Sequence, residues 1–396
     1  MADLEQILAD RLTEIRQAGL HRELISIDSA QGPRLTIDGH EFLNFSSNDY
    51  LGLANHNALR EAAAKAATDF GAGTGASRLI CGSLKPHQEL EESLAAFKGT
   101  EAALSFSTGY AAAIGAICAI MGKGDVLILD KLVHASIVDA ARLSGATLRV
   151  FRHNDLDDLQ KKLNWATEKH PASNTLIVTE SVFSMDGDLA PLLNIVELKE
   201  KHGAWLMADE AHATGLYGEH RRGLIEEFGL TGRVEIQMAT LGKAVGAAGG
   251  VICGSRSLID LLINKSRPFI YSTAPTPATV AAARAGIEII QGQEGEQRRQ
   301  RLWALVDLLK NTLVMAGLPP SAVRAPIIPT LIGDERAAVE FAKELREQNV
   351  FVPAIRYPTV ARKEARLRFT ISAGHTVADL EALTTAFKRI ATDETV

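Results

Sequence analysis

The stretch that decides the fold runs from residue 204 to residue 250 and begins AWLMADEAHATGLYGEH. Its first apolar run, WLMA, ends in Asp209, and His212 follows three residues later. A second apolar run ends in Thr240, and Lys243 follows three residues later. Short apolar runs bounded by turn residues are typical of buried parallel strands. Because ligands of open α/β sheets bind beyond the carboxyl ends of the strands, we expect these four side chains at one rim.

A carboxylate, an imidazole, a hydroxyl and an amine at one rim are the groups that a pyridoxal phosphate (PLP) site needs. The sequence DEAH at 209–212 also resembles the acidic box of a helicase-type ATPase, which requires a GxxxxGK[ST] phosphate loop. The Gly-Lys pairs at Lys123 and Lys243 are followed by Gly and Ala, so the sequence argues against an ATPase. A solvated loop lysine is the simplest alternative for Lys243, but the surrounding LGKAVGAAGG is unusually apolar for one.

Composition sets the outer limits. The chain has 396 residues, 46% of them hydrophobic and 23% charged, which fits a globular protein with one large domain and one smaller domain. A net charge of −6 argues against nucleic acid as a partner. The three cysteines are widely spaced, so they predict neither a disulfide framework nor a metal site, and they fit the reducing cytoplasm.

No segment predicts a membrane partner. The N-terminal sequence MADLEQILADRLTEIRQAGL is amphipathic and contains acids, unlike a signal or transit peptide. The longest apolar tract, residues 110–121, is too short to span a bilayer and reads as a buried helix. We therefore expect a cytoplasmic protein.

The pattern of elements changes along the chain. Up to about residue 292, helices are predicted at 3–18, 57–70, 86–97 and 278–292, a hairpin at 34–45, and strands at 101–106, 125–130, 175–180 and 250–255. Beyond that point, helices are predicted at 296–316 and 334–348, and strands at 327–332, 350–355 and 366–372. The sequence thus predicts an N-terminal segment (1–50) that packs with the small domain, a large domain (51–292) and a small C-terminal α/β domain (293–396).

Two turns rich in small residues need separate interpretations. The sequence GAGTGASRLICGS (71–83) resembles a dinucleotide fingerprint, but a helix rather than a strand precedes it, which argues against a Rossmann site. Its small residues indicate backbone that passes close to a ligand or a partner subunit. The turn STGY (107–110) opens a helix after a strand, so its N–H groups could hold a phosphate, although many such turns bind nothing.

The motifs SSNDYLGL, HASIVDAARLSG, VFSMDGDLAPL, ADEAHATG, TLGKAVGAAGG, YSTA and IRYPTV with ARLR follow one another along the whole chain. Together they resemble the α-oxoamine synthases, which are PLP-dependent enzymes of the aspartate-aminotransferase fold (fold type I). The resemblance implies a large, mostly parallel sheet domain with a smaller α/β C-terminal domain. It also implies a homodimer with active sites at the interface.

The resemblance further implies roles around the ring of the cofactor. Lys243 would form the Schiff base and later move the α-proton of the substrate. Asp209 would pair with the pyridine nitrogen and hold it protonated. His212 and Ser184 would hydrogen-bond to the 3-oxygen, and His134 would stack on the ring beside the substrate.

The phosphate of the cofactor has its own expected ligands. By the resemblance, the backbone amides of Gly109 and Tyr110 and the hydroxyl of Thr240 would hold it. Ser272 and Thr273 would reach the phosphate bound by the neighbouring subunit.

On the substrate side, the resemblance implies that Arg368 binds the carboxylate of the amino acid. Arg22, Asn48, Arg356 and Thr359 would line the acyl side. The substrates would be an amino acid and an acyl-CoA, joined with loss of carbon dioxide.

Within the family, FSMDGDLAPL, TLGKAVG and RHNDLDDL favour the branch of biotin synthesis, with L-alanine and pimeloyl-CoA, over the branch that uses glycine and acetyl-CoA. The chain departs from the biotin-branch pattern at Tyr357 and at residues 361–364, close to the expected acyl pocket. A non-enzymatic PLP-fold binding protein is the remaining alternative, and the presence of Asp209, His212 and Lys243 together argues against it.

Overall fold

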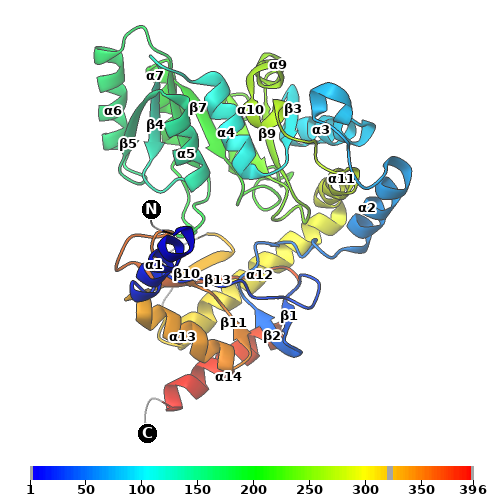
Figure 1. Ribbon diagram of the computed structural model, residues 1–396, viewed down its shortest axis with the longest axis vertical. Helices are drawn as coiled ribbons and strands as arrows, with labels where there is room; N and C mark the ends of the chain where they lie inside the picture. Colours follow the sequence, from blue (N-terminus) through cyan, green and yellow to red (C-terminus); the bar gives the residue numbers. More distant parts are fainter. Residues whose placement is uncertain (1–2, 319–323, 394–396) are drawn as a thin grey trace. The chain divides into compact units, whose positions relative to one another are not determined.

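The computed structural model describes residues 3–318 and 324–393 (Figure 1). The chain forms two compact units, one comprising residues 48–303 and the other residues 1–47 together with 304–396. Helix α12 (Gln293–Met315) begins in the first unit and ends in the second. The domain boundaries suggested by the sequence pattern, after residues 50 and 292, remain predictions.

The larger unit is built on a seven-stranded sheet. In spatial order its strands are β3 (Ala102–Phe106), β9 (Gly250–Gly254), β8 (Ile236–Thr240), β7 (Trp205–Asp209), β6 (Thr175–Glu180), β4 (Val126–Asp130) and β5 (Thr147–Phe151). Strand β9 is antiparallel to both neighbours, and the remaining neighbouring pairs are parallel. The mostly parallel sheet expected from the sequence is therefore confirmed.

Helices cover both faces of this sheet, which is why its central strands are apolar on both sides. One face packs against α4 (Gly109–Ile120), α5 (Ala135–Ser144), α9 (Arg256–Lys265) and α10 (Arg267–Ile270) around a core that includes Leu127, Val178 and Met207. The opposite face carries α3 (Lys85–Lys98), α6 (Leu156–Lys169) and α7 (Leu192–Lys201).

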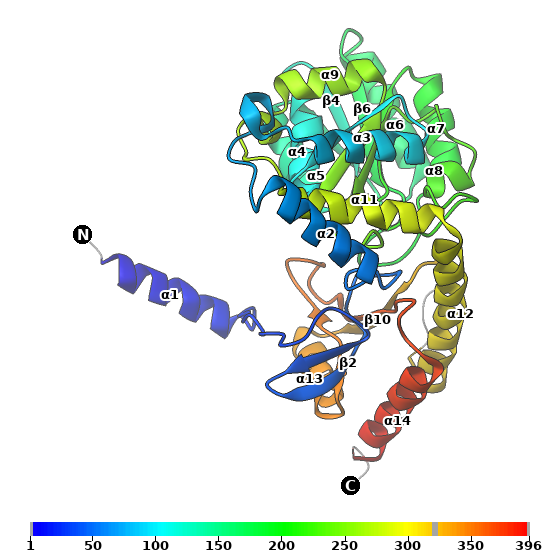
Figure 2. The same ribbon diagram turned by 90° about the vertical axis from the view of Figure 1, so that its right-hand side faces the viewer.

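The remaining helices of this unit lie at its margins. Helix α2 (Asn57–Phe70) and helix α11 (Pro277–Gln291) lie side by side (Figure 2). The short helices are η1 (Arg78–Gly82) and α8 (Leu224–Glu227). Edge strand β5 was not among the predicted strands, because its sequence TLRVF is only half-buried and gives a weak apolar signal.

The smaller unit contains two three-stranded sheets. The predicted hairpin is confirmed as β1 (Arg34–Ile37) and β2 (His40–Asn44), with Asp38 and Gly39 at positive φ in the turn. Strand β11 (Val350–Phe351) extends this sheet in parallel with β2. In the other sheet, β13 (Ala365–Thr370) pairs antiparallel with β10 (Ile327–Gly333) and with β12 (Ala354–Ile355).

One strand prediction in this unit is wrong. Residues 350–355 form two short strands in different sheets rather than a single strand. Pro353 lies between them and has no N–H group to donate to a ladder, so the chain leaves one sheet and enters the other at this point.

Three further helices complete the smaller unit: α1 (Leu4–Gln17), α13 (Glu335–Glu347) and α14 (Val377–Asp393). Every residue of α1 is exposed. No helix in the described part of the chain is long and apolar enough to cross a membrane.

Candidate active site

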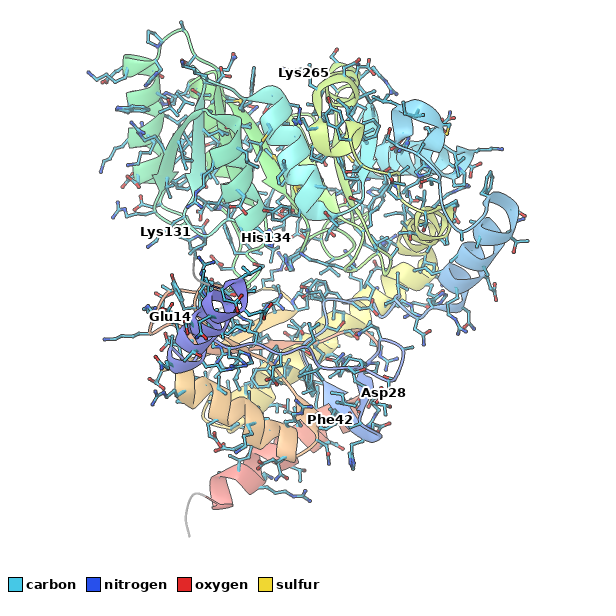
Figure 3. The ribbon with its side chains drawn as sticks, in the orientation of Figure 1. Glu14, Asp28, Phe42, Lys131, His134 and Lys265 are labelled. Carbon is cyan, nitrogen blue, oxygen red and sulfur yellow. The ribbon has the colours of Figure 1, made fainter. Side chains whose placement is uncertain are left out.

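The carboxyl ends of the parallel strands place several polar groups at one rim of the large sheet. Strands β4, β6, β7 and β8 end in Asp130, Glu180, Asp209 and Thr240 respectively. Glu180 and Asp209 are direct neighbours across the β6–β7 ladder. His134 follows β4 and caps the N-terminus of α5 with its ring exposed at this rim (Figure 3).

Asp209 is a buried acid held by its own turn. Its side chain accepts a hydrogen bond from the backbone N–H of Ala211 at 2.9 Å, and its carbonyl oxygen accepts one from the N–H of Ser181 at 2.8 Å. Burial raises the pKa of Asp209, and the nearby Lys243 ammonium acts in the opposite direction. Its carboxylate is therefore best stabilised when a cationic group faces it.

Lys243 begins a continuous chain of hydrogen bonds. Its Nζ lies 2.6 Å from Nε2 of His212, and Nδ1 of His212 lies 2.6 Å from the hydroxyl of Tyr50. The Tyr50 hydroxyl also contacts Oδ1 of Asn48 at 3.1 Å. Both His212 and Tyr50 are buried, so bulk water is excluded from the middle of this chain.

The amide oxygen of Asn48 fixes the direction of these hydrogen bonds. The amide oxygen of Asn48 can only accept, so the single proton of the Tyr50 hydroxyl points toward Asn48. Tyr50 then accepts from Nδ1–H of His212, which leaves the Nε2 lone pair facing Lys243. His212 is thereby placed to accept a hydrogen bond from the amine of Lys243.

Tyr50 was not identified as a site residue from the sequence. The motif SSNDYLGL contains both Asn48 and Tyr50, but only Asn48 was predicted to be a site residue. Tyr50 meets His212 across 162 positions of sequence, a contact that only the fold creates.

Glu180 is a second buried acid that sequence reasoning missed. Burial, together with the adjacent charge of Asp209, raises the pKa of Glu180 to about 8, so it retains its proton at neutral pH. Its carboxyl group accepts hydrogen bonds from the backbone N–H groups of His134 and Ser184. Among the described residues, its Oε1 has no hydrogen-bond partner. Glu180 therefore joins two segments that carry predicted cofactor ligands.

The turn before α4 forms a cradle for an anion. Gly109 and Tyr110 open the helix, where backbone N–H groups have no partner within the helix. A Cβ atom on Gly109 would lie 3.8 Å from Oγ1 of Thr240, so the turn and this hydroxyl are neighbours. A Cβ on Gly250 would lie 2.6 Å from Cα of Gly109, so only glycine allows β9 to pack this closely.

The side chains of this turn point elsewhere. The hydroxyl of Thr108 accepts from the N–H of Ala111 at 3.0 Å and caps the helix. The hydroxyl of Tyr110 donates to Asp139 at 2.6 Å. The hydroxyls of Thr108 and Tyr110 are thus bonded within the protein, and the role of the Gly109 and Tyr110 backbone amides as phosphate ligands stays a prediction.

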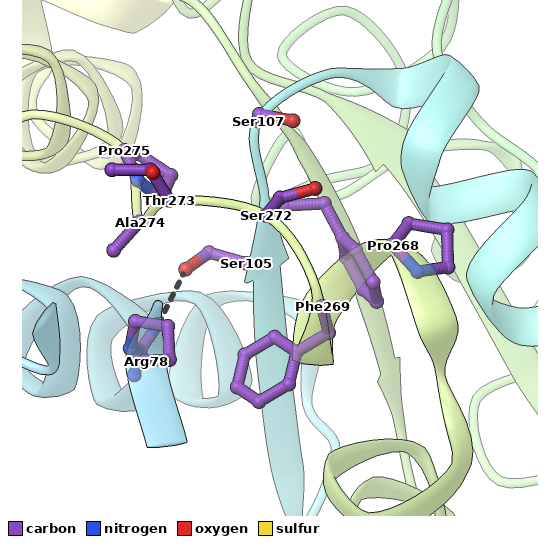
Figure 4. Close-up of a pocket in the computed structure, with 10 residues that line it drawn as sticks. Arg78, Ser105, Ser107, Pro268, Phe269, Ser272, Thr273, Ala274 and Pro275 are labelled. Atoms are coloured by element: carbon purple, nitrogen blue, oxygen red, sulfur yellow. Dashed lines mark hydrogen bonds between the residues drawn. The ribbon is translucent and has the colours of Figure 1, made fainter. Parts of the chain in front are cut away.

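Ser272 and Thr273 lie in a different pocket, lined by Ser107 as well (Figure 4). Thr273 pairs with Ser77 in an isolated β-bridge, which joins the YSTA segment to the small-residue segment at 71–83. Within residues 3–318 and 324–393, the Ser272 and Thr273 hydroxyls take part in no hydrogen bond, and Lys243 does not line this pocket.

The predicted acyl-side residues Arg22, Arg356 and Thr359 come together in the smaller unit. Arg356 donates to the carbonyl oxygens of Gly19 and His21, both at 2.7 Å, and Arg22 donates to the carbonyl of Tyr357 at 3.3 Å. The N–H of Thr359 donates to the carbonyl oxygen of Arg356 at 3.0 Å. Arg368 is buried on β13.

The arrangement in the larger unit fits PLP. It combines an amine, a buried carboxylate and an anion cradle at one end of one sheet. Within the described ranges, no group of three or more His, Cys, Asp or Glu residues is arranged to hold a metal ion.

Comparison with known proteins agrees with this geometry. The family model for class I and II aminotransferases matches residues 40–387. An 8-amino-7-oxononanoate synthase from Thermoanaerobacter pseudethanolicus is 44% identical over 97% of this chain and 96% of its own length.

Solved structures show the same fold. A serine palmitoyltransferase from S. paucimobilis, with PLP and myriocin bound, superimposes with a TM-score of 0.91 at 30% identity, covering 98% of both chains. An 8-amino-7-oxononanoate synthase from Francisella tularensis gives a TM-score of 0.73 at 27% identity, covering 89% of this chain and 99% of that one. With the family match over most of its length, this chain belongs to the class I and II aminotransferase family and is a PLP-dependent enzyme of fold type I.

Proposed function

We propose that this enzyme condenses L-alanine with pimeloyl-CoA, or another pimeloyl thioester, to give 8-amino-7-oxononanoate, coenzyme A and carbon dioxide in biotin biosynthesis. One structural observation carries the proposal. The hydrogen-bonded chain from Lys243 through His212 and Tyr50 to Asn48 lies at the same rim as buried Asp209. The naming of relatives 44% identical over nearly their full length supports the choice of reaction.

Each residue at the rim would have a separate role toward the cofactor. When bound, PLP withdraws electrons and so stabilises negative charge at the α-carbon of the amino acid. Asp209 keeps the ring nitrogen protonated by charge pairing. His212 and Ser184 would hydrogen-bond to the 3-oxygen, and His134 would stack on the ring.

Lys243 has two tasks in succession. Its Nζ would hold the cofactor, and the same Nζ would take the proton from the substrate α-carbon. A lysine acts as a base only when its amine is neutral. Nε2 of His212, 2.6 Å away, is placed to accept a hydrogen bond from Nζ and so to orient it.

A separate set of groups would hold the phosphate of the cofactor. The backbone amides of Gly109 and Tyr110 and the hydroxyl of Thr240 provide neutral donors at the positive end of the α4 dipole.

The proposed reaction balances as follows. A carbon–carbon bond forms between the α-carbon of L-alanine and the acyl carbonyl carbon, and the carbon–sulfur bond of the thioester breaks, releasing coenzyme A as its thiol. The bond from the α-carbon to its carboxylate breaks, releasing carbon dioxide, and a proton replaces the carboxylate. One proton is taken up overall.

The substrate-side roles follow the same proposal. Arg368 binds the amino acid carboxylate, for which a planar guanidinium provides two parallel hydrogen bonds. Arg22, Asn48, Arg356 and Thr359 serve the acyl side. A long acyl chain that ends in a carboxylate needs a polar or cationic end to its pocket, whereas an acetyl group does not.

The substrate pair is tested by specificity constants. With L-alanine as the fixed substrate, pimeloyl-CoA is expected to have a higher kcat/KM than acetyl-CoA or succinyl-CoA. A methyl group contributes only about 1–3 kcal/mol of discrimination, so glycine should be a poor but measurable amino acid substrate. Products are identified by mass, and a Lys243→Ala preparation serves as the blank.

Two results would contradict this assignment in different ways. If glycine with acetyl-CoA were the best pair, the protein would be a glycine C-acetyltransferase with the same cofactor chemistry. If no amino acid and acyl-CoA pair reacted while PLP still bound, a non-enzymatic binding role would replace the proposed one. Cell fractionation would test the cytoplasmic location that we also propose.

We further propose that the active form is a symmetric homodimer in which Ser272 and Thr273 reach the cofactor phosphate of the partner. Ser272 and Thr273 line a pocket that Lys243 does not line, so their hydroxyls take no part in the hydrogen-bonded chain that begins at Lys243. Beside them, Leu79, Ile80 and Tyr271 are 50%, 79% and 71% exposed, which is costly unless a partner covers them.

Ile80→Asp is therefore expected to convert the dimer to a monomer in light scattering and to weaken PLP binding. Leu193→Asp is the matched control, because Leu193 is also exposed but lies on α7, away from this patch. A fully active wild-type monomer, or an Ile80→Asp dimer with normal PLP affinity, would contradict the composite site.

A further inference from the structure

His153 lies between two carboxylates at the sheet rim, outside the cluster that the proposed reaction uses. It follows β5, and its Nδ1 lies 2.9 Å from Oδ1 of Asp130 at the end of β4. Its Nε2 lies 2.8 Å from Oδ2 of Asp188, in the loop that follows β6. Through its two ring nitrogens, His153 thus links the segment after β5 to the end of β4 and to the loop after β6.

Asn154, the next residue, also binds both Asp130 and Asp188. The backbone N–H of Asn154 donates to Oδ2 of Asp130 at 2.9 Å, and its side-chain amide donates to Asp188 at 2.8 Å and to the carbonyl of Leu189 at 3.2 Å. Asn154 has a φ of 55°, a left-handed conformation that asparagine tolerates better than most residues. We call His153, Asn154, Asp130 and Asp188 the rim clasp.

The rim clasp places one imidazole between two carboxylates. Burial disfavours the charged imidazole, but the hydrogen bonds that the ring donates to Asp130 and Asp188, together with their negative charges, outweigh burial and raise the pKa of His153 to about 10. His153 is therefore a cation at neutral pH. The side chain of Asp130 is completely buried, so loss of the imidazolium would leave a buried carboxylate without its counter-ion.

The rim clasp holds the segment that leads to His134. Oδ1 of Asp130 also accepts from the backbone N–H of Leu132 at 2.8 Å, which fixes the path of the chain just before His134. Lys131 and His134 lie at the same end of the sheet (Figure 3).

The same clasp holds the loop that carries Ser184. The carbonyl of Asp188 accepts from the N–H of Phe183 at 3.0 Å, and the ring of Phe183 meets the ring of His153 edge-on, with centroids 4.4 Å apart. Ser184 follows Phe183 directly. Glu180 binds the backbone N–H groups of His134 and Ser184 from the inner side.

We propose that His153 is a positioning residue for the cofactor site, because its two-carboxylate clasp fixes both the segment of His134 and the loop of Ser184. The role of these two residues as cofactor ligands rests on the proposed function, but the identity of the substrates does not enter. His153 itself touches neither the cofactor nor the reacting atoms.

His153→Gln tests the proposal, since glutamine has a single amide nitrogen and cannot donate to carboxylates on opposite sides. In the holoenzyme, hydrogen exchange should become faster in peptides covering 131–134 and 181–190 and stay unchanged on α9. The dissociation constant for PLP should rise about tenfold, the size typical for partners that orient a ligand-holding residue. The visible circular dichroism of the bound cofactor should change, while KM for the acyl thioester stays the same.

The control is His170→Gln, which removes another partly buried histidine of the same unit; its ring is tilted against that of Trp165, with centroids 4.8 Å apart, and it is not part of the clasp. Should His153→Gln fail to fold, Asp188→Asn breaks one half of the clasp and should give the same changes at smaller size. A lower Tm with unchanged PLP affinity and unchanged exchange in both peptides would overturn the positioning role. A preference for other substrates would overturn the proposed function and leave this result intact.

Discussion

Replacing Lys243 with alanine should lower kcat by about 10⁴-fold, the upper end of what a positioned proton-transfer group contributes. The expected loss is large because one nitrogen is both the attachment point of the cofactor and the base for the substrate α-proton. His212, whose Nε2 lies 2.6 Å from Nζ of Lys243, is an imidazole and cannot replace the amine once the lysine side chain is removed. Steady-state kinetics with L-alanine and pimeloyl-CoA measure the effect.

A chemical label checks the site independently of turnover. Borohydride treatment of the wild-type holoenzyme should fix a pyridoxyl mass on the peptide that contains Lys243, and treatment of Lys243→Ala should fix none. Lys265→Ala is the control, because Lys265 lies exposed at the end of α9 and should keep both label and activity (Figure 3). A label on another lysine in the wild-type protein would overturn the assignment of the site.

Asp209→Asn should keep PLP bound but lower kcat by about 10²–10³-fold, as expected for the loss of one preorganised electrostatic partner. Asparagine is the same size and can still accept from the N–H of Ala211, so the turn should be preserved. It carries no negative charge, and the ring nitrogen would lose the partner that holds its proton. The visible spectrum of the bound cofactor and kcat measure the two consequences separately.

Asp260→Asn is the matched control, since Asp260 lies exposed on α9. Wild-type turnover in Asp209→Asn would reject the charge-pairing role. Loss of PLP binding without change in the turnover of the loaded fraction would assign Asp209 to cofactor retention alone.

Much of the fold could be predicted because the relevant signals are local. The apolar runs ending in Asp209 and Thr240 form strands β7 and β8, and the turn at Asp38 forms the predicted hairpin. A strand that is buried on both faces is apolar along its whole length, so its local sequence is enough to predict it. Strand β5 was missed because most of its residues are only partly buried, so its apolar signal is weak.

The sequence by itself determined which chemical groups reach the rim, because a strand that ends in a polar residue delivers that residue to the carboxyl end of its sheet. Which of those groups act together was decided by the tertiary structure. Glu180 next to Asp209, Tyr50 against His212, and His153 between Asp130 and Asp188 are pairs of residues remote in sequence. Their pKa shifts and hydrogen bonds depend on burial and on distances of a few ångströms, which strand order and loop packing set and local sequence does not record.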